Sequence, residues 1–260
     1  MTPIISVKNI SKVYRMDKEK VVALRNVSFD VFTREICCIL GPSGSGKSTM
    51  LNLLAGLEKP TRGEIIIEGT AIEKLSEKDL ALFRQKHTGF IFQSYNLLSQ
   101  YTALENVALP LQFAGMDKKK RDLRAKKMLK LVGLGDRMKH YPRQMSGGQQ
   151  QRVGIARAFI NKPAVIFADE PTGNLDSKTR TSVMEMMVNF AHRFGQTIIL
   201  VTHDPQMAEY ADHTITLLDG QIVSQTYKKK EETPADTSTD YVSDTPLSAG
   251  TVLNAQPSKA

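Results

Sequence analysis

The chain has 260 residues, 41% of them hydrophobic and 24% charged, with a formal net charge of +8 at pH 7. This composition suits a soluble globular protein. No apolar run approaches the roughly 20 residues of a membrane span. Lys8 and Asn9 interrupt the first apolar stretch, which argues against a secretory signal. We therefore expect a cytoplasmic protein that contacts a membrane only through a partner.

The positive charge is distributed unevenly along the chain. Residues 231–260 hold five acidic side chains against one lysine, a net −4, which leaves +12 for the rest. A basic body suits nucleic acid, an anionic membrane surface or simply solvated lysines. The densest basic run, residues 118–121, lies in a helical pattern. This favours a solvated face, and we expect no nucleic-acid partner.

Short strands and turns alternate over residues 4–40. Within residues 5–10 and 22–31, apolar side chains recur at every second position, which is the period of a half-buried strand. Residues 35–40 read as a buried strand that leads into a glycine-rich stretch. The adjacent Cys37 and Cys38 would point to opposite faces of that strand, so we expect neither a disulfide nor a metal pair there.

The glycine-rich stretch matches the phosphate-binding loop pattern G-x-x-x-x-G-K-[ST] at every fixed position. Its members are Gly41, Pro42, Ser43, Gly44, Ser45, Gly46, Lys47, Ser48 and Thr49. Glycines let the backbone curl so that consecutive N–H groups point at a polyphosphate. Lys47 is placed to reach the β- and γ-phosphates, and the Ser48 hydroxyl to hold Mg²⁺. A strand before the loop and a helix after it make a chance glycine turn a poor alternative.

Strands and helices alternate through the remainder of the chain. Strands are predicted over residues 64–69, 89–93, 165–170 and 197–203, and a hairpin with an Asp-Gly turn over 214–223. Helices are predicted over residues 76–86, 117–132, 146–159 and 177–194. This alternation predicts an α/β fold with a mostly parallel sheet and helices on both faces.

The pattern also divides the chain into regions. Residues 1–230 are predicted to form one folded domain, which contains a helical, basic insertion at about 94–143. Residues 231–260 are rich in Pro, Ser, Thr, Ala and Asp and show no periodicity, so we predict a disordered acidic tail.

Two further motifs suit a nucleotide site. Asp169 and Glu170 end an apolar strand, where Asp169 would hold Mg²⁺ and Glu170 would polarise the water that attacks the γ-phosphate. Alone this is a weak signal, because capping carboxylates occur in the same place. The second motif is a helix start with two bare glycines, which suits a phosphate clamp or simply a flexible loop into a helix. It comprises Ser146, Gly147, Gly148 and Gln149.

Taken together, these motifs resemble the ATP-binding-cassette (ABC) ATPases over residues 4 to about 226. The segment 146–149 is similar to the family signature, with Met145 where leucine is commoner, and residues 174–176 look like the D-loop, which includes Asp176. The resemblance implies a P-loop NTPase with a RecA-like, mostly parallel sheet, an N-terminal antiparallel β subdomain and an inserted helical subdomain. It also implies ATP and Mg²⁺ as ligands.

The resemblance assigns roles to residues that carry little signal alone. It implies that Gln93 touches Mg²⁺ and the membrane partner, that His203 lies near the γ-phosphate, and that Tyr14 stacks on adenine. A glutamine after a strand, a satisfied histidine and a core tyrosine are the structural alternatives. We therefore expect Glu170, His203 and Gln93 to be catalytic. The expected metal ligands are Ser48, Gln93 and Asp169, and the loop, the signature, Tyr14 and Asp176 would bind nucleotide.

The family resemblance further implies a homodimer of cassettes. Each ATP would lie between the phosphate loop of one copy and the signature of the other, and the dimer would drive a transmembrane permease at the cytoplasmic face of the membrane. Residues 20–29, 89–98 and 168–177 resemble the subgroup of macrolide exporters, lipoprotein-release systems and antimicrobial-peptide exporters, which implies export or mechanotransmission. An importer ATPase or a cell-division cassette remains the alternative.

Two soluble branches of the family fit the sequence less well. Cassettes of DNA repair place a long coiled coil between phosphate loop and signature, and residues 47–146 contain no sustained heptads. Translation-associated cassettes carry two cassettes per chain, whereas this chain has one phosphate loop and one signature.

Overall fold

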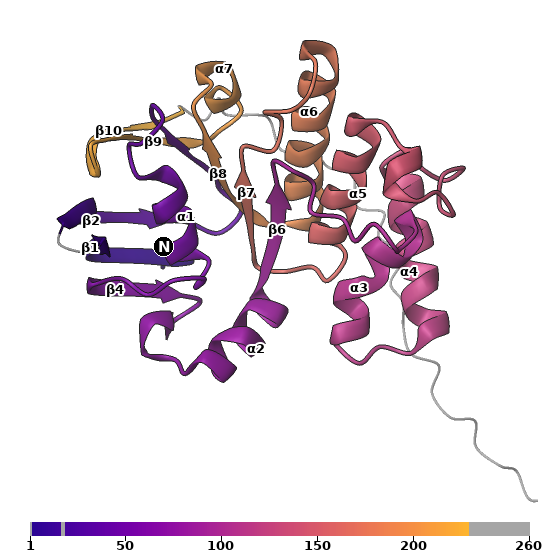
Figure 1. Ribbon diagram of the computed structural model, residues 1–260, viewed down its shortest axis with the longest axis horizontal. Helices are drawn as coiled ribbons and strands as arrows, with labels where there is room; N and C mark the ends of the chain where they lie inside the picture. The colour runs from indigo at the N-terminus through magenta and orange to yellow at the C-terminus, as the bar shows by residue number, and fades with distance from the viewer. Residues whose placement is uncertain (1, 17–18, 229–260) are drawn as a thin grey trace, which may run out of the picture. The chain divides into compact units, whose positions relative to one another are not determined.

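The computed structural model describes residues 2–16 and 19–228. The predicted acidic tail, 231–260, lies outside the described residues, as does the polar turn at 17–18. Two sheets organise the described part of the chain (Figure 1). One has four strands in the order β2-β1-β4-β5, and the other has six in the order β10-β9-β3-β8-β7-β6.

The two sheets differ in strand direction. The four-stranded sheet is antiparallel and consists of β1 (Ile5–Met16), β2 (Glu19–Val31), β4 (Arg62–Ile67) and β5 (Thr70–Ala71). The six-stranded sheet consists of β3 (Ile36–Leu40), β6 (Thr88–Phe92), β7 (Val165–Asp169), β8 (Thr197–Thr202), β9 (His213–Leu218) and β10 (Gln221–Tyr227). All its neighbouring pairs are parallel except β9 with β10. The predicted combination of a mostly parallel sheet with an antiparallel N-terminal subdomain is confirmed.

Along the chain, helices alternate with these strands. The α-helices are α1 (Lys47–Leu54), α2 (Glu77–His87), α3 (Ala103–Phe113), α4 (Lys118–Leu131), α5 (Gly147–Phe159), α6 (Ser177–Phe194) and α7 (Pro205–Ala208). Two single-turn 3₁₀ helices are η1 (Ile72–Lys74) and η2 (Pro142–Gln144). The predicted helices agree with α2, α4, α5 and α6 to within a residue or two at their ends.

The six-stranded sheet separates two hydrophobic cores. On β3, Ile36 and Cys38 face one core while Cys37 and Ile39 face the other, as strand alternation requires. The first core holds α3 to α6, and the second holds α1, α2 and the four-stranded sheet. The two cysteines are buried and unpaired. The phosphate loop and the signature therefore begin helices on opposite faces of one sheet.

The basic segment 94–143 is less helical than its sequence suggests. The α-helices occupy only the stretches of α3 and α4, and turns and irregular backbone fill residues 94–102. The fully buried Asn106 holds these turns, because its side chain accepts from the Leu98 N–H and donates to the carbonyls of Leu98, Tyr101 and Thr102. A buried amide that meets its hydrogen-bonding needs in this way stabilises non-helical backbone.

The hairpin formed by β9 and β10 packs against the phosphate loop. Asp219 and Gly220 have φ values of 46° and 74°, the positive values that a two-residue hairpin turn of type I′ requires. The Gly220 N–H donates to the Ser45 carbonyl at 3.0 Å. A Cβ on Gly220 would lie 2.6 Å from the Ala23 carbonyl oxygen, so only glycine fits where the hairpin meets β2.

Candidate active site

Four strand ends at one edge of the parallel sheet carry the predicted site residues. In register, Leu40 of β3 pairs with Thr202 of β8, and Val201 of β8 pairs with Asp169 of β7. Asp169 in turn pairs with Phe92 of β6. The residues that follow these strands are the phosphate loop, His203, Glu170 and Gln93. The carboxyl ends of parallel strands are where open α/β sheets bind ligands.

Glycines of the phosphate loop stand where side chains would collide. Gly46 has a φ of 100°, and a Cβ there would lie 2.6 Å from the Ala23 carbonyl oxygen. A Cβ on Gly41 would lie 2.2 Å from the Leu217 carbonyl oxygen. Gly44 has a φ of 81° with open space around it. The loop therefore keeps its curled backbone and its exposed N–H groups because glycine alone meets these conditions.

Polar groups inside this loop fit a phosphate ligand. The Lys47 side chain is buried and its Nζ donates to the Pro42 carbonyl at 2.8 Å, which folds the amine back over the loop. The hydroxyl of Ser45 is buried and has no hydrogen-bond partner among the described residues. Ser48 is exposed at the first turn of α1, next to the helix N-terminus. A buried hydroxyl without a partner and a buried lysine, beside a helix N-terminus, form a cradle for an anion.

The two carboxylates at the end of β7 have different environments. Burial raises the pKa of Asp169 above its ordinary value, and the charge of Glu170 adds to the rise while Lys47 opposes it. Glu170 adopts a φ of 41°, and its N–H donates to the Val201 carbonyl at 2.9 Å. Its Oε1 lies 2.8 Å from Nδ1 of His203. This turn therefore directs the Glu170 carboxylate toward the end of β8.

Gln93 lies against the loop that follows Glu170. The Asn174 side chain donates to the Gln93 carbonyl at 3.1 Å, and the Gln93 amide donates to Asn174 Oδ1 at 3.5 Å. A Cβ on Gly173 would lie 2.7 Å from Nε2 of Gln93 and 3.4 Å from Oε2 of Glu170. Gln93 and Glu170 are thus neighbours around a glycine that leaves room for both.

Tyr14 is held at the edge of this region by groups outside the predicted set. Its hydroxyl donates to Glu58 at 2.8 Å, and Lys12 Nζ lies 5.0 Å from the ring centroid. Burial raises the pKa of Tyr14, and an interaction with the Thr49 side chain of the phosphate loop opposes the rise. Tyr14 therefore lies beside the loop. The sequence could have predicted Lys12 as a neighbour of Tyr14, because residues two apart share one face of a strand.

The signature residues cap α5 and pack closely against their own chain. Ser146 and Gln149 form a capping box, in which the Gln149 N–H donates to the Ser146 hydroxyl and the Ser146 N–H donates to the Gln149 side chain. A Cβ on Gly147 would lie 2.6 Å from the Tyr95 hydroxyl, and one on Gly148 would lie 2.6 Å from Thr179. Glycine at both positions therefore lets the start of α5 pack closely against Tyr95 and Thr179.

Asp176 has a capping role at the next helix. Its carboxylate accepts from the Thr179 N–H at 3.0 Å at the start of α6, and hydrogen bonds from Thr179 lower its pKa. Within residues 2–16 and 19–228, no hydrogen bond or ion pair joins residues 146–149 or Asp176 to the phosphate loop. The structure of one chain thus brings together the loop, Asp169, Glu170, His203 and Gln93, but not the signature.

Known proteins are similar to this chain in sequence. A family model described as ABC transporter matches residues 24–173. The chain is 51% identical over 219 residues to an uncharacterized ABC transporter ATP-binding protein of Methanocaldococcus jannaschii, covering 84% of this chain and 97% of the relative. The chain belongs to the ABC transporter family. It is an ATP-binding and ATP-hydrolysing cassette, as its sequence predicted.

The cassette also matches part of a larger protein. It is 47% identical over 223 residues to the macrolide export ATP-binding/permease protein MacB of Escherichia coli K12. This match covers 86% of the cassette and 34% of MacB, so the cassette spans about a third of MacB's length.

Solved structures of cassettes have the same fold. The post-hydrolysis dimer of the ATP-binding cassette MJ0796 with ADP and Pi superposes with a TM-score of 0.80 at 42% identity, covering 86% of this chain and 98% of that one. The cassette cbiO1 of Clostridium perfringens, part of the ABC transporter complex cbiONQ, has a TM-score of 0.79 at 26% identity, covering 87% and 89%. No helix among the described residues is long and apolar enough to cross a membrane.

Proposed function

We propose that this cassette hydrolyses ATP with Glu170 as the general base that polarises the attacking water. His203 would orient the Glu170 carboxylate and contact the γ-phosphate, and Lys47 would bind the β- and γ-phosphates. The observation that carries this proposal is the Glu170–His203 contact of 2.8 Å at the strand edge that also holds the phosphate loop. Tyr14, beside Thr49, would stack on the base.

The donor set at this edge fits Mg²⁺. We assign the ion to the Ser48 hydroxyl, the Asp169 carboxylate and the Gln93 amide, which are the hard oxygen ligands that Mg²⁺ prefers. No group of three or more His, Cys, Asp or Glu side chains gathers within residues 2–16 and 19–228. That suits an ion held by one or two carboxylates together with substrate phosphates. Bound there, Mg²⁺ would neutralise charge on the β- and γ-phosphates.

The active unit in this proposal is a homodimer with two ATP molecules. One chain carries its phosphate loop at α1 and its signature at α5, on opposite faces of the sheet. A signature that completes the ATP site must then come from a second copy, related by a two-fold axis. Asp176, next to the signature of its own chain through Thr179, would lie at that interface. The dimers of MJ0796 support this arrangement.

We further propose a membrane permease as partner, with the cassette at the cytoplasmic face of the membrane. The 47% identity to MacB favours an export or mechanotransmission system of the MacB and LolD type. The alternative is an importer or cell-division ATPase. The lower identity to cbiO1, 26%, is only weak support against it, because all of these cassettes share the fold.

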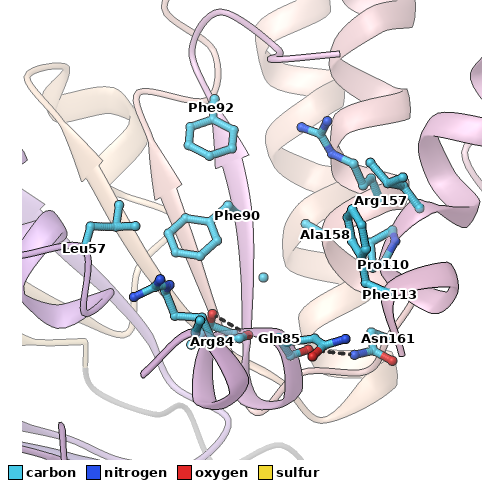
Figure 2. A pocket seen from close by; sticks show the side chains of 14 residues that line it. Leu57, Arg84, Gln85, Phe90, Phe92, Pro110, Phe113, Arg157, Ala158 and Asn161 are labelled. Carbon is cyan, nitrogen blue, oxygen red and sulfur yellow. Dashed lines mark hydrogen bonds between the residues drawn. The ribbon is translucent and has the colours of Figure 1, made fainter. Parts of the chain in front are cut away.

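A cavity beside β6 is the proposed docking site for a short helix of the permease. It has a volume of about 600 Å³ and lies between α2, β6, α3 and α5 (Figure 2). Its apolar lining includes Leu57, Phe90, Phe92, Pro110 and Phe113, with Arg84 and Arg157 at its edges. An apolar helix face with a carboxylate would complement it. Because Gln93 directly follows Phe92, a helix bound there would lie next to the ATP site.

Six aromatic and apolar residues lie around Gln93 in the sequence, and only some of them line this cavity. They are Phe90, Phe92, Tyr95, Leu97, Leu98 and Tyr101. Phe90 and Phe92 line the cavity, whereas Tyr95 and Leu97 pack against the helical core instead.

A dimerisation experiment tests the proposed site. Glu170→Gln should bind ATP and Mg²⁺ but hardly hydrolyse it, so the ATP-bound dimer should accumulate on a sizing column. Lys47→Ala, which lacks the phosphate contact, should stay monomeric under the same conditions. A Glu170→Gln protein that turns over ATP at the rate of the unmodified cassette would remove Glu170 from its proposed role.

A further inference from the structure

The backbone directly after Gln93 is held in an uncommon conformation. Tyr95 and Asn96 have φ values of 61° and 46°, so two consecutive residues with side chains are left-handed. The left-handed region is unfavourable for residues with a Cβ, although asparagine tolerates it better than tyrosine. The turn's own hydrogen bonds are Tyr95 N–H to the Phe92 carbonyl at 3.2 Å and Asn96 N–H to the Ser94 carbonyl at 2.6 Å. Further contacts must stabilise it.

Arg157 of α5 provides those contacts. One guanidinium nitrogen donates to the Asn96 carbonyl at 2.6 Å, and the other donates to the Tyr95 carbonyl at 2.9 Å. The planar fork of arginine suits two adjacent acceptors, and a charged donor strengthens both bonds. Burial lowers the pKa of Arg157, but arginine keeps its charge at neutral pH.

The same turn touches the other end of α5. A Cβ on Gly147 would lie 2.6 Å from the Tyr95 hydroxyl, and one on Gly154 would lie 3.7 Å from the Tyr95 carbonyl oxygen. Gly147 and Gly154 are seven residues apart and share one face of the helix. The turn therefore lies along α5 from the signature to Arg157.

A second side chain of α5 holds the loop that follows the proposed catalytic carboxylate, Glu170. Gln151 is fully buried, and its amide donates to the carbonyl of Pro171, the residue after Glu170. The helix that starts at the signature thus contacts the segments that follow both Gln93 and Glu170.

We infer that Arg157 is a positioning residue, which ties the turn after Gln93 to the signature helix and so sets the place of Gln93 in the ATP site. This inference rests on the proposed function, because it assigns Arg157 a role through Gln93. Arg157 also lines the proposed docking cavity, across from Phe90 and Phe92 (Figure 2). A permease helix in that cavity would therefore contact the same side chain that holds the turn.

A double-mutant cycle on ATP turnover tests the inference. Arg157→Met removes both donors, so Gln93 loses its fixed position and kcat should fall by up to about 10²-fold, as small misplacements in an active site do. The dissociation constant for ATP should stay close to that of the unmodified cassette, because the phosphate loop is untouched. Gln93→Ala should lower kcat similarly. In the Gln93→Ala background, Arg157→Met should cost nothing further.

Arg152 offers a matched control on the same helix. It also makes two hydrogen bonds, to the Val132 carbonyl at 3.2 Å and to Ser182 at 3.0 Å, but neither is to the turn. In the double variant, the fold-losses of kcat from Arg152→Met and from Gln93→Ala should multiply to within about twofold, because independent sites act additively in free energy. Arg157→Lys keeps the charge and one donor, and should recover part of the turnover.

Each other outcome counts against the inference. Unchanged turnover in Arg157→Met, or losses that multiply with Gln93→Ala, would mean that Arg157 does not act through Gln93. If Gln93→Ala itself turns over normally, the role of Gln93 fails as well, whereas Glu170→Gln still tests the wider proposal. If Arg157→Met does not fold by thermal melting, Arg157→Lys replaces it in the cycle.

Discussion

The carboxylate of Glu170 and the imidazole of His203 lie 2.8 Å apart, at the ends of adjacent parallel strands. The exposed fractions of their side chains are 21% and 58%, so the carboxylate is the more enclosed of the two. This contact joins two strand ends that are separated by more than thirty residues in the sequence. It depends on the left-handed backbone of Glu170, which turns the side chain toward β8.

Replacing His203 should therefore lower the rate of ATP hydrolysis much more than the affinity for ATP. In His203→Ala, Glu170 loses its partner, and we expect kcat for ATP to fall by about 10²-fold or more, the scale of general acid–base effects. The affinity for ATP should change much less, because Lys47 and the loop remain. His192→Ala, an exposed histidine on α6, is the control. Equal turnover in the two variants would exclude a role for His203.

The glycine at the end of the phosphate loop should tolerate no side chain. In Gly46→Ala the Cβ would meet the Ala23 carbonyl oxygen at 2.6 Å and φ would stay near 100°. We expect a loss of roughly 1–3 kcal/mol in the free energy of unfolding from strain alone, more from the clash, and weaker ATP binding.

Gly115→Ala is the control that has backbone strain without a steric clash. Gly115 has a φ of 76° but nothing lies within 4 Å of its Cβ position, and it lies outside the site. Denaturant unfolding and ATP titration of both variants provide the measurement. ATP affinity in Gly46→Ala equal to that of Gly115→Ala would contradict the expectation.

The half-buried carboxylate of Asp169 should reduce stability at neutral pH. Its folded-state pKa lies above its ordinary value, mainly through burial. A group of this kind contributes stability below the unfolded pKa and loses it as the pH rises through the folded pKa. Asp169→Asn should therefore unfold at higher denaturant concentration at pH 7 in the absence of nucleotide, and the gain should shrink toward about pH 4. It should also lose Mg²⁺-dependent turnover.

An exposed carboxylate supplies the comparison for this pH series. Asp136 is 70% exposed and pairs with Arg137 at the surface. Asp136→Asn should leave the unfolding midpoint nearly unchanged at both pH values, because surface ion pairs contribute little. A lower midpoint for Asp169→Asn than for the unmodified protein at pH 7 would show that the charged carboxylate is stabilised after all.

The docking cavity predicts a variant that separates the cassette from its permease. Phe113 lines the cavity and is 67% exposed, so Phe113→Glu should fold normally and hydrolyse ATP as an isolated subunit. A buried charge opposite an apolar helix face should prevent binding, which co-purification with the permease measures. Leu123→Glu, at a 55% exposed position on α4 that does not line the cavity, should bind normally. Normal recovery of the permease with Phe113→Glu would place docking elsewhere.

The sequence by itself determined the chemistry and the kind of fold. The loop at 41–49, the carboxylates at 169–170 and the signature at 146–149 are local patterns, because phosphate cradles and helix caps are built from consecutive residues. Alternating strands and helices likewise predict a parallel sheet, since βαβ connections leave few other topologies. The Asp-Gly turn of the closing hairpin is equally local.

Only the tertiary structure decided which of these patterns meet. Strand order places β3, β8, β7 and β6 side by side, and that order brings Gln93, Glu170 and His203 to one edge. No local rule predicts that Arg157 reaches back to the carbonyls of Tyr95 and Asn96, more than sixty residues earlier. Nor does spacing reveal that the sheet separates phosphate loop from signature. Such contacts depend on the packing of helices onto a finished sheet, and packing is a property of the whole fold.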